Sequence, residues 1–378
     1  MSLGTRIYAE LRGDRTIWMV VAILAIVSIL AVYSSTGTLA YKHQGGNTEF
    51  YLLKQFAFVA FGLFLTYICY LLHYTQYSRI APVLLLLSIP LLVYTLAFGI
   101  EMNDARRWIE IPVLRMTFQT SDFAKMALVI YVARAISSKQ EYIKDFNSAF
   151  LPIIVPILII CGLIAPADLS SALMLFTTCL IMMFIGRVDM KYIILLFFLG
   201  VVVFAFLIII GHLYPDIVRS GTWISRVQEF MTNSDGDFQT QQAKIAIAEG
   251  SFFGLGPGNS IQRNHLPAPF SDYIYSIICE EYGLFGGFVI LTLYVLLFFR
   301  VVSIVTRSPK AFGAMLVVGL GVSIVIQALA NMAVSVDLVP VTGLTLPLIS
   351  MGGTSYLFSS IAFGMILSVS RYIEKTTT

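Results

Sequence analysis

Ten long apolar stretches run along the chain, separated by short polar segments and one long polar segment. A helix needs roughly 20 predominantly apolar residues to cross a bilayer. The stretches cover residues 17–34, 55–72, 81–98, 118–136, 150–165, 169–186, 192–213, 272–300, 311–336 and 347–370. The fifth and sixth form a hairpin broken at Pro166. The pattern predicts an all-α integral membrane protein, a single polytopic domain over residues 1–378 with about ten transmembrane helices.

Composition agrees with a membrane protein. Of the 378 residues, 58% are hydrophobic and only 12% are charged, whereas a soluble domain carries about a quarter charged residues. The net charge of +3 is too small to indicate a nucleic-acid partner. These values argue against a soluble enzyme and against a nucleic-acid-binding protein.

The positions of the positive charges predict the orientation of the helices. Cytoplasmic loops of membrane proteins carry an excess of Lys and Arg. The terminal arms and the short loops on their side hold 13 of the 24 Lys and Arg residues, whereas the long segment 214–271 holds four. We therefore expect both termini in the cytoplasm and residues 214–271 as one extracytoplasmic loop between helices seven and eight.

Five charged residues depart from that rule. Arg106, Arg107 and Arg115 lie just outside the third span, and Asp122 and Lys125 lie inside the fourth. The i,i+3 spacing puts Asp122 and Lys125 on one helix face, and charges inside a span usually face a cavity. The cluster indicates an anionic ligand on the outer side. The alternatives are lipid-headgroup anchoring by the arginines and a purely structural Asp122–Lys125 ion pair.

Two segments of the long loop have informative patterns. Residues 239–250 predict a short amphipathic helix. Its apolar side consists of Ala243, Ile245, Ala246 and Ile247. The glycine-rich segment 254–260 lacks the preceding strand of a dinucleotide fold and the Lys of a P-loop, which excludes both. Its glycines predict a tight turn that brings backbone close to a substrate or a helix end.

Polar groups also mark the last spans. Asp272 lies at the start of the eighth span, either as a helix N-cap or as a general base beside a basic cavity. Glu280 and Glu281 lie two turns further along, where polar packing and a functional role are both open. Pro347 and the glycine pair 352–353 predict a broken or re-entrant start to the last span, which is tolerated only where protein or water satisfies the backbone.

Five sequence motifs occur in order along nearly the whole chain. They are Asn103-Asp-Ala-Arg-Arg-Trp108-Ile, Phe118-Gln-Thr-Ser-Asp122-Phe-Ala-Lys125, Pro166-Ala-Asp168-Leu, Asn259-Ser-Ile-Gln-Arg-Asn-His-Leu-Pro267 followed by Ser271-Asp272-Tyr-Ile-Tyr, and Thr342-Gly-Leu-Thr-Leu-Pro-Leu-Ile-Ser350-Met-Gly-Gly-Thr-Ser355. Together they resemble the SEDS family of cell-wall glycosyltransferases, which includes FtsW and RodA. The Asn259-Ser260 pair favours the division branch, FtsW, and the elongation branch, RodA, is the related alternative.

Four positions depart from the family's pattern. Ala268 stands where the family has Glu, Asp122 replaces Glu, and Thr120 and Ala167 each replace Pro. The Ala268 position argues against any mechanism that needs a second carboxylate there. The position of the family's catalytic Asp is kept, as Asp272.

The resemblance implies polymerisation of lipid II, the undecaprenyl-pyrophosphate-linked disaccharide-peptide, during septal cell-wall synthesis. Asp272 would accept the proton of a GlcNAc 4-OH that attacks MurNAc C1 with inversion, and fixed cations would stabilise the leaving pyrophosphate. Substrate contacts are expected at Arg107, Asp122, Lys125, Asp168, Gln241, Asn259, Arg263 and Ser350. No dedicated metal cage is visible, and a divalent cation, Mg²⁺ or Mn²⁺, acting through Asp272 or Asp168 stays open.

The resemblance also implies a place and a partner. It points to the bacterial cytoplasmic membrane at the division septum, with a class B penicillin-binding protein transpeptidase, other division proteins and membrane lipid as partners. Two other classes of function are open: a flippase that moves lipid II across the bilayer, and an inactive scaffold for a synthase. The charged motifs concentrate on the outer face rather than along a path across the bilayer, which favours the polymerase.

Overall fold

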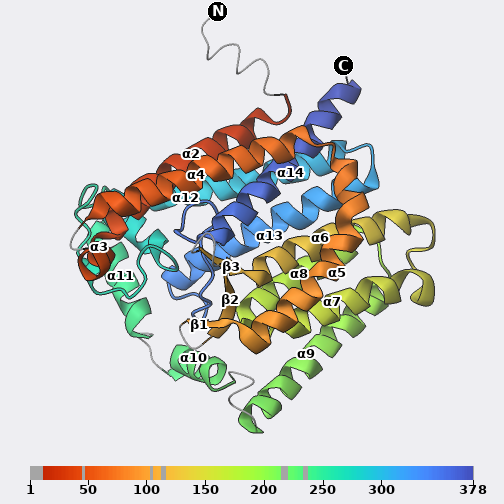
Figure 1. Cartoon of the computed structure of the whole chain (residues 1–378), viewed down its shortest axis with the longest axis horizontal. Coiled ribbons are helices and arrows are strands. Elements are labelled where there is room, and N and C mark those ends of the chain that lie inside the picture. The colour runs from red at the N-terminus through yellow and green to blue at the C-terminus, as the bar shows by residue number, and fades with distance from the viewer. Residues whose placement is uncertain are drawn as a thin grey trace, which may run out of the picture.

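The computed structural model describes residues 12–44, 47–102, 105–111, 116–213, 220–232 and 237–377. Most of them are helical (Figure 1). The α-helices are α2 (Arg15–Ser35), α3 (Gly37–Gln44), α4 (Thr48–Leu71), α5 (Tyr74–Phe98), α6 (Thr120–Ser138), α7 (Leu151–Ile164), α8 (Leu169–Ile185), α9 (Met190–Leu213), α10 (Ser220–Thr232), α11 (Phe238–Gly250), α12 (Ile274–Arg307), α13 (Ala311–Ser335) and α14 (Thr354–Thr377).

The predicted spans coincide with helices, which confirms the fold class. In the described part of the chain, seven helical segments are long and apolar enough to cross a membrane: α2, α4, α5, the segment Phe146–Ile164 that contains α7, α12, α13 and α14. Two further apolar helices, α8 and the Met190–Val203 part of α9, are shorter. Helix α6 is more polar because it carries Asp122, Lys125 and Arg134. The chain is therefore a multi-pass membrane protein.

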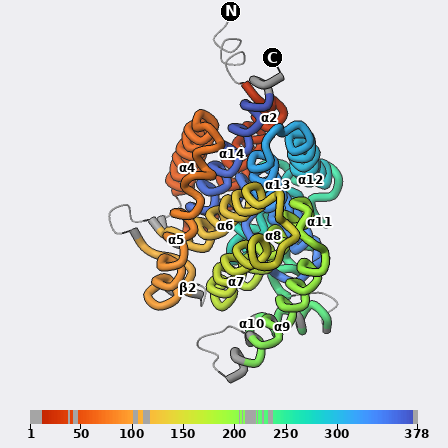
Figure 2. Tube along the Cα trace, turned by 90° about the vertical axis from the view of Figure 1, so that its right-hand side faces the viewer, coloured from red at the N-terminus to blue at the C-terminus, as the bar shows by residue number. Residues whose placement is uncertain are grey.

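Helix α13 forms the centre of the bundle and packs against α6, α8, α12 and α14 (Figures 1 and 2). Of its apolar stretch 72% is buried, against 22% for α4, whose side chains are largely left for lipid. Small residues bring α4 and α14 together: a Cβ on Gly62 would lie 2.6 Å from Ser360 Oγ, and one on Gly364 would lie 2.5 Å from the Thr66 carbonyl oxygen. Such close helix approaches through small residues are typical of membrane bundles.

A small antiparallel sheet is a feature that the all-α prediction missed. Strands β1 (Ile100–Met102), β2 (Ala105–Ile111) and β3 (Met116–Gln119) follow α5 in the order β1-β2-β3. The prediction placed Phe118 in the fourth span, but Phe118 belongs to β3, where it pairs with Ile109, and α6 begins at Thr120. The sheet pairs the backbone of a polar connection outside the apolar spans.

The predicted helix at 239–250 is confirmed as α11. Ala243 and Ala246 are buried as expected, but Ile245 is 40% exposed, so the predicted apolar side is too wide. Helix α12 begins at Ile274 and continues past the predicted end to Arg307, with its helical geometry interrupted at Gly283 (φ 70°). The chain before α14 is non-helical from about Pro340 to Gly353, which confirms the broken start predicted for the last span.

Candidate functional site

Asp272 lies two residues before α12, and its side chain does not cap that helix. Tyr273 is the N-cap residue, without a side-chain hydrogen bond to the helix. The carboxylate of Asp272 instead accepts a hydrogen bond of 2.8 Å from the Ser271 hydroxyl, on Oδ1. The N-cap alternative for Asp272 is therefore wrong, and this half-buried residue has a position that needs another explanation.

The segment that precedes α14 holds the backbone around Asp272 in place. The Asn331 amide, on α13, donates to the carbonyl oxygens of Asp272 (2.8 Å) and Leu344 (2.7 Å). The Ser350 hydroxyl donates to the Ser271 carbonyl oxygen (2.7 Å). Gly343 has φ +68°, and a Cβ added there would lie 3.8 Å from Asp272 Oδ2. The broken segment before α14 thus lies beside Asp272, and Ser350 contacts it through the backbone.

Burial is the main influence on the charge of Asp272, and it raises the pKa of this carboxyl above its ordinary value. The Ser271 hydrogen bond and then the positive charges of Arg107 and Arg226 lower the pKa in part, while the negative charge of Asp168 raises it. A carboxylate with a raised pKa is a stronger base. The fold has therefore brought Asp272, Arg107 and Asp168 within electrostatic reach of one another, although the chain separates them widely.

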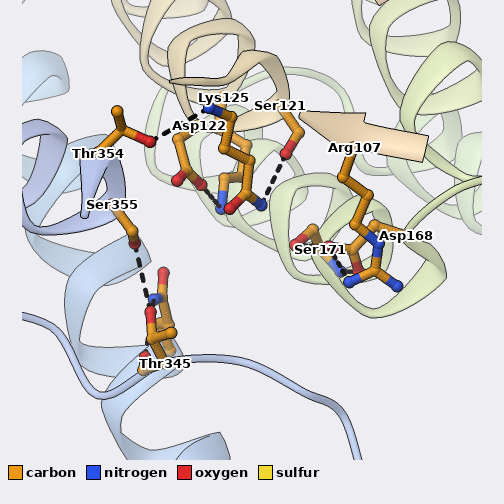
Figure 3. Close-up of polar contacts among 11 residues, drawn as sticks. Arg107, Ser121, Asp122, Lys125, Asp168, Ser171, Thr345, Thr354 and Ser355 are labelled. Carbon is orange, nitrogen blue, oxygen red and sulfur yellow. Dashed lines mark hydrogen bonds and ion pairs between the residues drawn. The ribbon is translucent and has the colours of Figure 1, made fainter. Parts of the chain in front are cut away.

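Arg107 and Asp168, which both act electrostatically on Asp272, form an ion pair (Figure 3). Arg107 Nη1 on β2 lies 3.2 Å from Asp168 Oδ2, and its Nε donates to the Ala167 carbonyl oxygen at 2.8 Å. Asp168 is the N-cap of α8 and accepts hydrogen bonds from the backbone N–H (3.1 Å) and the hydroxyl (2.8 Å) of Ser171. These contacts fix the guanidinium in one orientation, with Nη2 making no hydrogen bond to a described residue.

Asp122 and Lys125 form the second predicted pair, on α6 (Figure 3). Lys125 Nζ lies 2.8 Å from Asp122 Oδ1, and the two side chains are 12% and 5% exposed. Asp122 Oδ2 is buried without a hydrogen-bond partner in the described part of the chain. The pair confirms the predicted geometry, and its role as a ligand contact stays a prediction.

A pocket of about 60 Å³ borders this pair. Gln327 and Ser355 also line it. Both contact Thr345: Gln327 Nε2 donates to its carbonyl oxygen at 2.8 Å, and the hydroxyls of Thr345 and Ser355 are 3.2 Å apart. Thr345 follows Leu344, which Asn331 holds together with Asp272. This pocket, called the Lys125 pocket below, is thus connected to the surroundings of Asp272 through the segment that holds Leu344 and Thr345. The volume of the pocket suits a few water molecules rather than a sugar.

The glycine-rich segment is fastened to α12 by Glu280 and Glu281. Glu280 Oε1 accepts the backbone N–H groups of Ile261 (2.7 Å) and Gln262 (3.1 Å). Glu281 accepts hydrogen bonds from the Ser34 hydroxyl and from the backbone of Gly258. Both carboxylates are buried. Glu280 and Glu281 are therefore explained by polar packing, the first of the two roles that the sequence left open. The tight turn predicted for residues 254–260 lies against α12.

Two of the expected substrate residues lie on this fastened loop. Arg263 donates to the Ser34 carbonyl oxygen at 2.9 Å and acts electrostatically on Glu281. The cations that lower the pKa of Asp272 are Arg107 and Arg226, which lie elsewhere in the chain. Asn259 is exposed, and its amide donates to the Leu255 carbonyl oxygen at 3.0 Å.

Several residues of the site were missed by the sequence analysis. Arg226 on α10 donates to the Val341 carbonyl oxygen at 3.1 Å and so faces the same non-helical segment. Gln327 and Asn331 could have been predicted as site residues from the sequence, because polar side chains four residues apart inside an apolar span share one helix face. Arg115, Asn103 and Asp104 lie outside the described residues. In the part that the structure describes, no three His, Cys, Asp or Glu side chains gather as a metal site.

The chain is similar in sequence and in fold to known proteins. A family described as a cell cycle protein family, comprising FtsW, RodA and SpoVE, matches residues 14–375. The "Probable peptidoglycan glycosyltransferase FtsW" of Trichlorobacter lovleyi is 33% identical over 368 residues, covering 94% of this chain and 93% of that protein. A chain of a peptidoglycan synthase complex superimposes with a TM-score of 0.73 at 22% identity, covering 96% of this chain and 98% of that one. The rod shape determining protein RodA of Thermus thermophilus superimposes with a TM-score of 0.67 at 21% identity, covering 95% and 97%.

Proposed function

This chain belongs to the FtsW, RodA and SpoVE family of cell cycle proteins, and we propose on that basis that it is a peptidoglycan glycosyltransferase that polymerises lipid II in septal cell-wall synthesis. The observation that carries the proposal is the environment of Asp272. Its carboxyl, on a half-buried residue, has a pKa raised by burial and lies within electrostatic reach of Arg107 and Arg226. A base next to fixed cations suits a reaction that removes a proton and expels a pyrophosphate.

Asp272 serves as the general base. A sugar hydroxyl is a weak nucleophile until its proton is removed, and Asp272 accepts that proton as the GlcNAc 4-OH attacks MurNAc C1. General-base help of this kind contributes about 10²–10⁴-fold. Asn331 and Ser350 donate hydrogen bonds to the backbone carbonyl oxygens of Asp272 and Ser271. The base is therefore positioned before substrate binds. Attack from the face opposite the lipid pyrophosphate inverts the configuration at C1.

Arg107 stabilises the leaving pyrophosphate. Its guanidinium is already oriented by Asp168 and Ala167, and Nη2, which makes no hydrogen bond to a described residue, can donate to a phosphate oxygen. A preoriented cation at the place where negative charge develops lowers the barrier without having to reorganise. Lys125 acts from the pocket that it shares with Asp122. Asp122 Oδ2 has no hydrogen-bond partner among the described residues and marks a polar site that a substrate group or water completes.

The other expected contacts come from the extracytoplasmic loop. Gln241 lies partly buried on α11, a helix that packs against α12, and Asn259 stands exposed on the fastened glycine-rich segment. Both offer amide groups suited to the hydroxyls and amides of the disaccharide-peptide. Arg263 contributes through the loop, by holding it to the end of α2.

The protein works with a class B penicillin-binding protein transpeptidase in the cytoplasmic membrane at the septum, with both termini in the cytoplasm. Support comes from the fold it shares with a chain of a synthase complex in which polymerization and crosslinking are coordinated. Crosslinking needs glycan strands as they emerge, which makes a transpeptidase the natural neighbour of a polymerase. Other division proteins would bring this pair to the septum.

Purified protein, alone and with the transpeptidase, tests the proposal when given labelled lipid II in liposomes. We expect glycan chains, resolved by gel electrophoresis. Redistribution of lipid II between leaflets without glycan chains would identify a flippase, and neither outcome, with or without the partner, would identify a scaffold. Both results contradict the proposal.

A further inference from the structure

A cavity of about 480 Å³ opens at the end of the bundle away from Asp272. It lies where the chain entering α2 meets the last turns of α12 and α14. Its lining includes Asp14, Arg300, Ser303, Ile304, Arg307 and Ser370. This volume is much larger than that of the Lys125 pocket, and nothing in the proposed reaction uses it.

One of the two arginines in this cavity is neutralised and the other is not. Asp14 is 7% exposed, and its Oδ1 accepts the backbone N–H groups of Thr16 (3.0 Å) and Ile17 (3.1 Å). Its Oδ2 accepts Arg300 Nε (2.8 Å) and Nη2 (2.5 Å). Arg307 is exposed and forms no ion pair with a described residue. The described residues that line the cavity therefore carry one net positive charge, beside the hydroxyls of Ser303 and Ser370.

The ends of α2 and α12 indicate how this cavity lies relative to the membrane. Asp14 and Arg300 join the two helices at this end, and Ser34 and Glu281 join them at the other. About 20 helical residues separate Asp14 from Ser34, which corresponds to about 30 Å at 1.5 Å per residue. That is the thickness of the hydrocarbon core. The cavity therefore lies at the level where phospholipid phosphates meet the bilayer core.

Apolar side chains continue from the cavity towards the bilayer. Phe299 and Val302, on the last turns of α12, are 63% and 44% exposed, and they are the immediate neighbours of Arg300 and Ser303. A positive, hydroxyl-lined cavity next to a lipid-facing apolar surface matches a molecule with a phosphate head and acyl chains. A soluble anion would gain nothing from that surface.

We propose that this cavity binds the phosphate headgroup of an anionic phospholipid, which on the proposed topology belongs to the inner leaflet. Arg307 supplies the charge, Ser303 and Ser370 donate hydrogen bonds to phosphate oxygens, and the acyl chains lie along Phe299 and Val302. The bound headgroup bridges the junction of α2, α12 and α14 and therefore stabilises the folded protein against heating.

Native mass spectrometry of the purified full chain, titrated with phosphatidylglycerol or phosphatidylcholine, tests this site. We expect phosphatidylglycerol to bind about 10-fold more tightly, as a charge-assisted hydrogen bond to phosphate allows. Arg307→Gln should abolish that preference and the accompanying rise in Tm. Lys310→Gln is the matched control, because Lys310 is exposed and basic but lies outside the cavity lining.

Three results would overturn the proposal. Equal binding of the two lipids by the unmodified protein would show that no anionic headgroup is selected. Equal losses in Arg307→Gln and Lys310→Gln would assign the preference to diffuse surface charge. Displacement of phosphatidylglycerol by excess inorganic phosphate would show a site for soluble anions, in which the acyl chains have no part.

Discussion

Replacing Asn331 with Ala should disable Asp272 without altering its side chain. The Asn331 side chain is buried, and its amide donates to the carbonyl oxygens of Asp272 and Leu344 at 2.8 and 2.7 Å. An unsatisfied buried polar group costs about 1–3 kcal/mol. Leaving both carbonyl oxygens without their donor should therefore lower the free energy of unfolding by about 2–6 kcal/mol. The backbone at Asp272 would also lose its link through Asn331 to Leu344, although Ser350 would still hold Ser271. A shift of about 1 Å in a catalytic group costs about 100-fold in rate.

Polymerisation kinetics with labelled lipid II measure the effect on the folded variant. We expect kcat to fall by about 100-fold while KM changes much less, because Asn331 holds backbone rather than substrate. Ser335→Ala is the matched control, since Ser335 is buried one turn further along α13 and donates to the Asn331 carbonyl oxygen (3.0 Å). A folded Asn331→Ala variant with unchanged kcat would refute the positioning role.

The isosteric change Asn331→Asp separates positioning from packing. It keeps the volume of the side chain but replaces the amide donor with an acceptor and adds a negative charge near Asp272. A negative neighbour raises the pKa of a carboxyl. The acid limb of the kcat–pH profile should therefore move to higher pH in this variant, whereas a merely structural defect would lower kcat equally at all pH values.

The double change Asp122→Asn with Lys125→Met removes both charges of the buried pair together, and we expect the folded variant to lose polymerisation; normal activity would make the pair structural. Because a general base works in its ionised form and burial raises the pKa of Asp272, kcat should fall with decreasing pH through an acid limb above about 3.9, the ordinary Asp value. A limb at or below that value contradicts the assignment. A reporter fused after Asp237 should lie outside the cell and one after Lys375 in the cytoplasm; the same side for both contradicts the topology.

The spans and the main charged pair were predictable because their signals are local. Apolar length defines a transmembrane helix, and i,i+3 spacing alone brought Asp122 to Lys125. The sheet at residues 100–119 was missed because short strands in a polar connection have no strong periodic signal. The interruption of α12 was missed because a single Gly283 inside an apolar run does not reveal that a distant loop packs against it.

The arrangement around Asp272 depends on contacts between distant segments, and sequence reasoning recovered only part of it. The resemblance singled out Arg107, Asp168 and Asp272 one by one, but their convergence follows from how β2, α8 and α12 pack. Asn331 acts through backbone carbonyl oxygens, which no side-chain motif encodes. The roles of Glu280 and Glu281 stayed open for the same reason, since both accept hydrogen bonds from backbone groups of a loop about 20 residues earlier in the chain, and Glu281 also accepts one from the distant Ser34 hydroxyl.

Polymerisation by Asp272→Asn protein tests the central claim most directly. Asn is nearly isosteric with Asp and can accept the Ser271 hydrogen bond, but it cannot take up a proton as a carboxylate does. Expression, thermal stability and binding of the transpeptidase should be preserved while polymerisation of lipid II falls by at least ~100-fold, the lower end of a general-base contribution. Near-normal polymerisation by this variant would contradict the account, and the catalytic carboxylate would then have to be sought at Asp168, Glu280 or Glu281.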